Sequence, residues 1–540
     1  MSRSPRDPDI TQAPLIVSSS QDNDDAPQTA ITVSVQPQSP VNNDIPPPWQ
    51  DIFKKEFEQS WPLMLRGAVV AGRYFAISVM LGKVNERLLA PNTLINALET
   101  VLITFGGGSL GIISSMISKA NGENKKAEIG VLCRQGLVFA TLLSIPISLL
   151  YYFANNHLLT LFGQHPFAVD KAKDYFQSAA LGYLPLMLLT AEQRLLQGLQ
   201  RPIPVLMSNV LHSGLSVACS YLFLFGKLDA PTLEMKGVGY AFAIAGWASL
   251  IVNTIYLLCS SSLRDYQLTD MNWDLTNNDF KEMVKKGLPS GLQATTDNIA
   301  NMINSIFLGL HNLTALAADQ MAAQIALLIG IANRGLGQAV SVCIGKSLGE
   351  KKYAAIKRYG NAGILSGMLF PTVALLFFIF MREKFVGIYV DTKNPENAEL
   401  VKLASLFLLF EPLRQFTTGV QSTAAAGLLG LKDTAFTAKM SLAFSLILNA
   451  AILCLMHFWL HLNSLSLFAA KTIGVGTAAF FNTGRWLLLS HEQSEQDKAE
   501  VKEMTVCDRV SRSMGLFCGK QERHDVSDLV HAETYSAAVV

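Results

Sequence analysis

Long apolar segments recur along most of the chain, and they constrain the fold more than any other feature of the sequence. Each segment has about 20 residues, enough for an α-helix rising 1.5 Å per residue to cross a hydrocarbon core ~30 Å thick. Only 16% of the residues are charged, whereas a soluble domain has about a quarter. These features predict an all-α membrane protein that crosses the bilayer many times.

Twelve such segments lie between two polar ends of the chain. Their approximate limits are 61–81, 93–118, 130–153, 174–198, 203–225, 237–259, 288–310, 317–345, 359–381, 400–427, 435–457 and 464–489. Because twelve is even, both termini are expected on one side of the membrane. The connections on that side include Lys125, Lys126, Lys351 and Lys352, although the opposite connections also contain basic residues. Basic loops tend to face the cytoplasm, so we expect a protein of the cell (inner or plasma) membrane with both termini cytoplasmic.

Three polar regions flank or separate the spans. Residues 1–50 are rich in Pro, Gln, Asn, Asp and Ser and are predicted to form a disordered tail. Residues 491–540 are charged, lack a span and are predicted to form a polar cytoplasmic tail. The stretch 261–287 is predicted to be a cytoplasmic linker between an N-lobe, 51–260 (spans one to six), and a C-lobe, 288–490 (spans seven to twelve).

The two halves of the chain repeat each other at a constant offset. FKKEFEQSWP, which ends at Pro62, matches FKEMVKKGLP, which ends at Pro289. At the same offset, ISKANGENKK (117–126) matches IGKSLGEKKY (344–353). Six spans in each half give the halves the same orientation, related by an axis along the membrane normal. Folds of this kind bind substrate between the halves, so a transporter is expected rather than a channel or an intramembrane enzyme.

Five motifs resemble those of the multidrug and toxic compound extrusion (MATE) family. They are LLQGLQRP (195–202), KKGLPSGLQATTD (285–297), ALAADQMAAQI (315–325), SVCIGKSLGEKK (341–352) and GLLGLKDT (427–434). In two of these motifs, Gly198 and Gly427 are expected to end comparable segments of the halves. The resemblance extends from about residue 53 to 489. It implies a V-shaped transporter of two six-helix lobes that exports organic, cationic or amphipathic drug-like compounds in exchange for H⁺ or Na⁺ as the lobes rock.

Polar residues inside the spans are the candidates for binding. Gln293, Asp297, Asn301 and Asn304 are spaced by four, four and three residues, which places them on one helical face. A charge at the bilayer centre costs at least ~2.5–3.5 kcal/mol and persists where it is paired or lines a cavity. Asp297 follows Pro289 by eight residues, where drug-exporting MATE proteins often carry an acidic residue. We predict that this face contacts the substrate or the coupling cation; the alternative is a polar face packed against another helix.

Four further residues are predicted to bind the substrate or the cation. They are Glu99, Glu192, Glu411 and Thr418. Many bacterial MATE proteins carry an aspartate in span one, but Ile77 occupies that place here, so Glu99 or Glu192 is a candidate substitute in the N-lobe. The frequent acidic position of span ten falls on Thr418, with Glu411 two turns earlier.

Arginines inside the spans need partners because the guanidinium stays protonated. The predicted ion pairs are Arg73 with Glu99, Arg334 with Asp297, and Arg414 with Glu411. These pairs would hold one conformation and exchange partners during rocking. The alternatives are an anionic or zwitterionic substrate held by the arginines, and simple contact with water. A pair between Arg334 and Asp297 would weaken the case for cation coupling at Asp297.

Several functions and ligands are not expected from this sequence. A net charge of +1 offers no basic surface for nucleic acid, and the seven cysteines have no metal-ligand spacing. The glycine run FGGGSLG (105–111) lacks the lysine of a phosphate loop, so ATP is not expected. No catalytic constellation or cofactor motif is present, and a transporter rather than an enzyme is predicted. We expect the partners to be a small organic substrate and the lipid bilayer, and the chain to be a monomer.

Two alternative functions stay open at the level of the sequence. One is a flippase of lipid-linked precursors from the wider superfamily, whose cavity would need basic residues for a pyrophosphate. The other is a membrane scaffold or sensor that has lost transport and acts through its tails.

Overall fold

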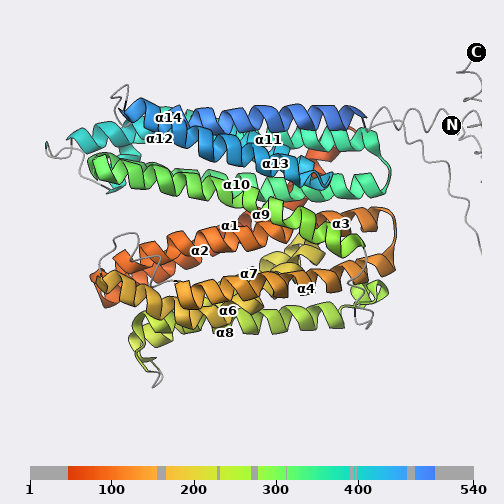
Figure 1. Ribbon diagram of the computed structural model, residues 1–540, viewed down its shortest axis with the longest axis horizontal. Helices are drawn as coiled ribbons and strands as arrows, with labels where there is room; N and C mark the ends of the chain where they lie inside the picture. Colours follow the sequence, from red (N-terminus) through yellow and green to blue (C-terminus); the bar gives the residue numbers. More distant parts are fainter. Residues whose placement is uncertain are drawn as a thin grey trace, which may run out of the picture. The chain divides into compact units, whose positions relative to one another are not determined.

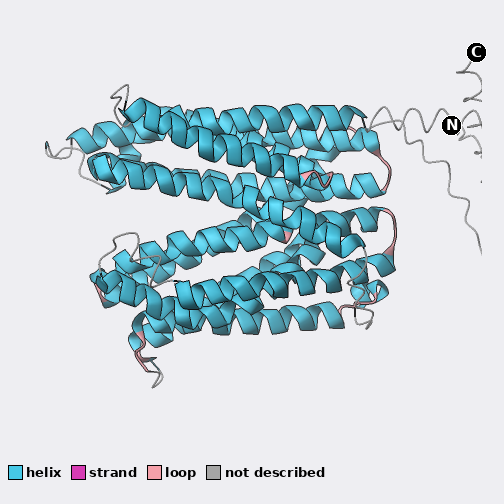
Figure 2. Cartoon of the chain, in the orientation of Figure 1, coloured by secondary structure: helices cyan, strands magenta, loops and turns pink. Residues whose placement is uncertain are grey.

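The structure is a computed structural model, and helices account for nearly all the residues that it describes. These residues are 47–154, 166–227, 231–268, 278–311, 313–389, 395, 398–458 and 469–492. None of them lies in a β-strand (Figure 2). The predicted tails fall almost entirely outside the described residues.

The helices of the N-terminal half coincide with the first six predicted spans. They are α1 (Trp49–Val84), α2 (Leu89–Ser109), α3 (Gly111–Gly122), α4 (Lys126–Leu149), α6 (Pro166–Gly198), α7 (Pro202–Phe225) and α8 (Glu234–Cys259). Consecutive helices α2 and α3 form the second span, and α4 continues as a π-helix over Leu150–Ala154. A short 3₁₀ helix, Glu86–Leu88, joins α1 to α2, and another, Ser261–Tyr266, follows α8.

The C-terminal half supplies the other six spans. Its helices are α9 (Asn278–His311), α10 (Leu313–Gly349), α11 (Tyr353–Tyr389), α12 (Ala398–Gly430), α13 (Thr434–Met440), a π-helix (Ser441–Leu448), α14 (Asn449–Phe458) and a final helix, 469–492. Among the described residues, eight helices are long and apolar enough to cross a membrane. The more polar helices α6, α9 and α12 carry Glu192, Asp297 and Glu411. The predicted fold of twelve helices in two six-helix repeats is confirmed.

The helices pack as two lobes, and each lobe contributes one helix end to the other (Figure 1). Ile52, in the first turns of α1, is fully buried in a cluster with Cys343 of α10 and Tyr359 of α11. In the same way Met283, near the start of α9, is fully buried in the core of the N-lobe. The starts of α1 and α9 therefore join the lobes to each other through apolar contacts.

The lobes meet where α3 and α10 end, and residues 115–124 and 341–351 are called here the joined end. A Cβ atom added to Gly122 would lie 3.0 Å from Gly349 Cα, so only glycine allows the two backbones to approach this closely. Just after these helices, Asn124 and Lys351 both have positive φ, 57° and 55°. The repeat predicted from the sequence is thus reproduced in backbone geometry.

One expectation about the repeat was wrong. Gly198 at the end of α6 packs against Ile117, and Gly430 at the end of α12 packs against Ile344, the residue that matches Ile117 in the repeat. Gln200 and Lys432, each two residues beyond its glycine, have backbone φ angles of 60° and 64°. Gly430, and not Gly427, is therefore the counterpart of Gly198. The offset between these two glycines is larger than that between Ile117 and Ile344, because the connections within the two halves differ in length.

The predicted linker, 261–287, begins and ends as ordered structure. Its first turn packs on α4, since Arg134 Nη1 donates to the carbonyl of Gln267 at 2.8 Å. Nearby, Lys126 Nζ lies 2.8 Å from Asp265 Oδ2. The last ten residues of the linker belong to α9. The connections that carry Lys125, Lys126, Lys351 and Lys352 therefore lie together at the joined end. The lobe boundaries themselves stay predictions.

Candidate functional site

The polar face of α9 lies beside the face of this helix that packs on α2 of the N-lobe. The positions of α9 that touch α2 include Gly291 and Ala294, which approach Ser109 and Gly108, and Asn298, whose Nδ2 donates to Thr104 Oγ1 at 3.2 Å. At ~100° per residue, Asp297 points about a quarter of a turn from these contacts. The predicted face therefore borders α2 without packing against it.

Asp297 has no bonded partner in the part of the chain that the structure describes. Its Oδ1 atom is buried without a hydrogen bond, and neither an ion pair nor a hydrogen bond is formed by the carboxylate. Gln293 and Asn301 are half-buried on the same face, whereas Asn304 is fully buried and its side-chain atoms also lack hydrogen bonds. These unbonded polar atoms can accept a ligand without first losing an internal contact.

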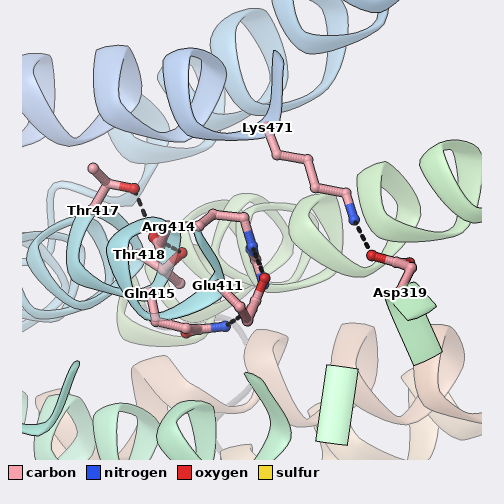
Figure 3. A network of polar contacts seen from close by, with 7 residues as sticks. All are labelled: Asp319, Glu411, Arg414, Gln415, Thr417, Thr418 and Lys471. Carbon is pink, nitrogen blue, oxygen red and sulfur yellow. Dashed lines mark hydrogen bonds and ion pairs between the residues drawn. The ribbon is translucent and has the colours of Figure 1, made fainter. Parts of the chain in front are cut away.

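The predicted pair on α12 is formed and is bidentate (Figure 3). Arg414 donates to Glu411 from Nε at 2.9 Å and from Nη2 at 2.5 Å, and Gln415 Nε2 adds a third donor at 3.0 Å. The spacing of three and four residues explains the geometry, because such positions stack on one helical face. Thr418 donates to the carbonyl of Arg414 at 3.1 Å, so its hydroxyl is used within the helix.

A second ion pair in the C-lobe was not predicted. Lys471, on helix 469–492, points toward Asp319 of α10, with Nζ and Oδ1 3.8 Å apart and both side chains buried (Figure 3). Arg414 interacts electrostatically with Asp319 and with Asp297. The only sequence signal was a single lysine near the start of the apolar span 464–489. The C-lobe thus gathers charged groups from α9, α10, α12 and the last helix.

The expected pair between Arg334 and Asp297 is not formed in the described structure. Of the charged groups, Arg414 has the largest electrostatic effect on Asp297, and Arg334 comes second. The Arg334 side chain is exposed and folds back along α10, since a Cβ atom on Gly330 would lie 3.3 Å from its Nη1 atom. Gly330, one turn earlier, leaves room for this conformation, which directs the guanidinium along its own helix.

The N-lobe contains its own buried pair. Arg73 Nη2 lies 3.9 Å from Glu99 Oε1, and Tyr175 donates to Glu99 Oε2 at 3.0 Å. The guanidinium also lies 4.4 Å from the ring centroid of Tyr74. A small cavity adjoins these groups, and Ile77 lines it. Ile77 therefore places an apolar side chain beside the Arg73–Glu99 pair.

Glu192 lies apart from the Arg73–Glu99 pair. It is buried between α6 and α8 and accepts from Asn253 Nδ2 at 2.7 Å and from Thr254 Oγ1 at 2.6 Å. Its neighbour Arg194 donates instead to the Gly107 carbonyl at 2.7 Å. The structure thus brings Asp297, Glu411 and Arg414 into one region and leaves Glu99 and Glu192 in separate places of the N-lobe. Among the described residues, no group of His, Cys, Asp and Glu is arranged to bind a metal ion.

Comparisons with known proteins point in one direction. A family model described as MatE matches residues 62–222 and 289–455. The chain is 26% identical over 442 residues to a probable multidrug resistance protein NorM of Synechococcus sp., covering 81% of this chain and 94% of that protein. It is also 26% identical over 375 residues to the multidrug resistance protein NorM of Aliivibrio fischeri, covering 69% and 80% respectively.

Solved structures of low sequence identity share the fold. The eukaryotic MATE transporter AtDTX14 matches with a TM-score of 0.71 at 16% identity, over 83% of this chain and 99% of that one. A transporter of the MOP superfamily from Pyrococcus furiosus, described as having a binding pocket of reverse polarity, matches with a TM-score of 0.73 at 17% identity, over 82% and 97%.

Proposed function

The chain belongs to the MatE family, and from that premise we propose that it is a secondary active transporter that exports organic, cationic or amphipathic compounds in exchange for H⁺ or Na⁺. It is a multi-pass membrane transport protein and not an enzyme. Relatives that cover most of the chain are named multidrug resistance proteins, which supports a role in drug efflux. The substrate class, the exchanged ion and the movement of the lobes are our proposal.

The free carboxylate of Asp297 is the observation that carries the proposal. Glu99, Glu192, Glu411 and Asp319 each have an ion pair or hydrogen bonds to their carboxylates. Asp297 has neither in the described structure. A cation can therefore bind at Asp297 without breaking an internal pair, whereas it would have to displace a partner at the other four carboxylates.

Exchange follows if the same carboxylate serves the ion and the substrate. A carboxylate that holds a proton or Na⁺ no longer presents a free negative charge to an organic cation, so the two ligands compete. Gln293 and Asn301 lie half-buried on the same face and offer amide groups to the rest of the substrate. The neighbouring Arg414 lowers the negative potential at Asp297 and favours release of either cation.

Rocking of the lobes would carry the site from one side of the membrane to the other. The contacts of α1 with α10 include Gly67 with Ile331 and Arg66 Nη1 with Gln338 Oε1 at 3.4 Å, and they continue to the joined end. We place the joined end on the cytoplasmic side of the cell membrane, because the connections with Lys125, Lys126, Lys351 and Lys352 lie there. The structure then corresponds to a state that is closed toward the cytoplasm, with a monomer as the transporting unit.

The buried arginines favour drug export over a lipid-precursor flippase. A pyrophosphate would need several arginines without internal partners, yet Arg73 and Arg414 are paired with carboxylates and Arg194 is bonded to a carbonyl. Arg334, which forms no bond in the described structure, offers one guanidinium and not a cluster. The alternative of a scaffold that acts through its tails has a separate test. Deletion of residues 1–50 and 491–540 should leave transport intact if the two lobes form the transporter.

Ethidium flux in proteoliposomes tests the proposal. Proton and sodium gradients are imposed separately on the wild-type chain, on Asp297→Asn and on Asp170→Asn, an exposed aspartate at the start of α6 that serves as the control. One gradient should drive flux in the wild type and in Asp170→Asn. Loss of a charge-assisted contact of ~1.5–3 kcal/mol should reduce that flux about 10- to 100-fold in Asp297→Asn.

Each outcome assigns a role to Asp297. Flux that one gradient drives and that Asp297→Asn lacks identifies the ion and supports coupling at this residue. Gradient-driven flux of wild-type size in Asp297→Asn would make Asp297 structural and move the search to Glu99, Glu192 and Glu411. No flux under either gradient in the wild type would exclude export of this cation by exchange.

A further inference from the structure

A buried carboxyl group at the joined end takes no part in the site described above. Glu56 lies on α1, five residues before the predicted span 61–81. With 36 residues, α1 is about 54 Å long at 1.5 Å per residue, well beyond a hydrocarbon core of ~30 Å. Because the predicted span begins at residue 61, we take the first turns of α1, which carry Glu56, to lie outside the core of the membrane.

Glu56 is enclosed by both lobes. Ile52, one turn earlier on the same face, is buried in a cluster with Cys343 of α10 and Tyr359 of α11. Only 1% of the Glu56 surface is exposed. Cys343 and Tyr359 both interact electrostatically with its carboxyl group. Glu56 is therefore buried only while the start of α1 stays packed against α10 and α11.

Nothing in the described surroundings neutralises a charge on Glu56. Neither Oε1 nor Oε2 has a hydrogen-bond partner. Its two neighbours across the contact, Cys343 and Tyr359, are themselves influenced by further charged groups. These are Asp51 and Lys55 of α1 and Lys346 and Glu350 at the end of α10. Lys55 Nζ lies 5.8 Å above the Tyr359 ring, and Lys346 Nζ donates to Gln200 Oε1 at 3.0 Å. Both lysines are thus engaged elsewhere.

A bare carboxylate in this position is strongly disfavoured. Burying an unpaired charge costs several kcal/mol even after relaxation, and a titratable group avoids that cost by becoming neutral. The repeat offers an internal comparison, because the position that matches Glu56 in the second half is Met283, also fully buried. An uncharged side chain therefore suits this place in the fold, and packing alone does not require a carboxyl group.

We propose that Glu56 is a proton-binding site that is filled when the lobes join and emptied when they separate. This proposal rests on the rocking movement proposed above. On closure, a hydronium ion gives its proton to a carboxylate oxygen of Glu56, forming an O–H bond and leaving water. When α1 parts from α10 and α11, water reaches the carboxyl group and takes the proton back. Each opening of the joined end thus releases one proton at that end.

The native thiol of Cys343 reports this movement, because it is 1% exposed and lies in the buried cluster that the start of α1 covers. The full-length chain is labelled with N-ethylmaleimide between about pH 6 and 9, without substrate or gradient, and labelling is quantified at each cysteine. Cys133, buried within the N-lobe core, is the reference thiol in the same sample. The ratio of Cys343 to Cys133 labelling rates then follows opening at each pH.

We expect this ratio to rise with pH by up to about tenfold per unit in the wild type, since opening releases one proton. In Glu56→Gln, a neutral side chain of nearly the same shape, the ratio should not change with pH. Glu58→Gln, an exposed glutamate two residues later, should keep the wild-type slope. Equal slopes in the wild type and in Glu56→Gln, or a wild-type Cys343 that is never labelled, would overturn the proposal.

A second variant guards against a folding defect. Glu56→Met copies the repeat-related Met283 and should also remove the pH dependence. The slope is measured without transport, so the two proposals can fail separately. Suppose that the labelling ratio rises with pH in the wild type and in Asp297→Asn, but that the wild type shows no flux under either gradient. Glu56 is then a proton site, and the export proposal is overturned. Gradient-driven flux in the wild type, together with a Cys343 to Cys133 ratio that does not change with pH, would support the export proposal and overturn the proton site at Glu56.

Discussion

Lys471 shows how strongly single charges shape the interior of this protein. Its ammonium group and the Asp319 carboxylate are both buried, and they lie on helices far apart in the chain. Together with Glu411 and Arg414 they form two compensated pairs next to the uncompensated Asp297. The charge available to a ligand in the C-lobe is therefore set by which carboxylates already have a partner.

Removal of Lys471 should destabilise the C-lobe. Lys471→Met leaves Asp319 buried without its cation, and breaking a buried pair in this way costs about 3–5 kcal/mol. Adding Asp319→Leu should recover most of the loss, because neither charge is then left alone. Thermal unfolding of the purified chain measures both effects, with Lys402→Met, an exposed lysine of α12, as the control. A double variant no more stable than Lys471→Met would contradict this account.

At the scale of helices, the ends of α3 and α10 depend on glycine. Gly122 and Gly349 lie at repeat-related positions, and each faces the backbone of the other helix. Backbone atoms cannot move aside as a side chain can, so these glycines set how closely the helices approach. Gly484, on the last helix, has no neighbouring atom within 4 Å of an added Cβ. The variant Gly484→Ala is therefore a control that adds a methyl group to a helix without a steric clash.

Gly349→Ala should weaken the joined end. The added methyl group meets the backbone at Lys119, and overpacking of this kind costs ~1–3 kcal/mol. Since 1.36 kcal/mol corresponds to a factor of ten, labelling of Cys343 should rise about 5- to 100-fold at fixed pH. Gly484→Ala should leave labelling unchanged and be neutral or slightly stabilising. Equal labelling in the two variants would show that the glycine contact does not hold the lobes together.

At the scale of the molecule, the two lobes are built alike but carry charge differently. The N-lobe holds an internal pair, Arg73 with Glu99, next to the apolar Ile77. The C-lobe holds the free Asp297. In the proposed function, this asymmetry would place the exchange of cations in the C-lobe and leave the N-lobe as its partner in the rocking movement.

A disulfide across the joined end should stop that movement. A Cβ atom on Gly345 of α10 would lie 3.4 Å from Ser118 Cβ of α3, close to the separation found in disulfides. Oxidation of the double variant Ser118→Cys, Gly345→Cys should abolish gradient-driven flux, and reduction should restore it. The two single variants, treated with oxidant in the same way, control for side reactions. Undiminished flux in the cross-linked protein would argue against rocking about this end.

The sequence alone determined the class of the protein, its twelve spans and its internal repeat, because hydropathy and periodicity are properties of local segments. It also indicated the Glu411–Arg414 pair, whose members are one helical turn apart, and the polar face around Asp297. Their geometry is now described, while their roles in binding and coupling stay predictions.

Only the tertiary structure decided which distant side chains meet. The pairing of Lys471 with Asp319, the hydrogen bonds to Glu192, the missing contact between Arg334 and Asp297, and the enclosure of Glu56 all depend on how helices rotate and tilt against one another. That rotation is set by the summed packing of many side chains, such as the close approach at Gly122 and Gly349, and no single segment contains it.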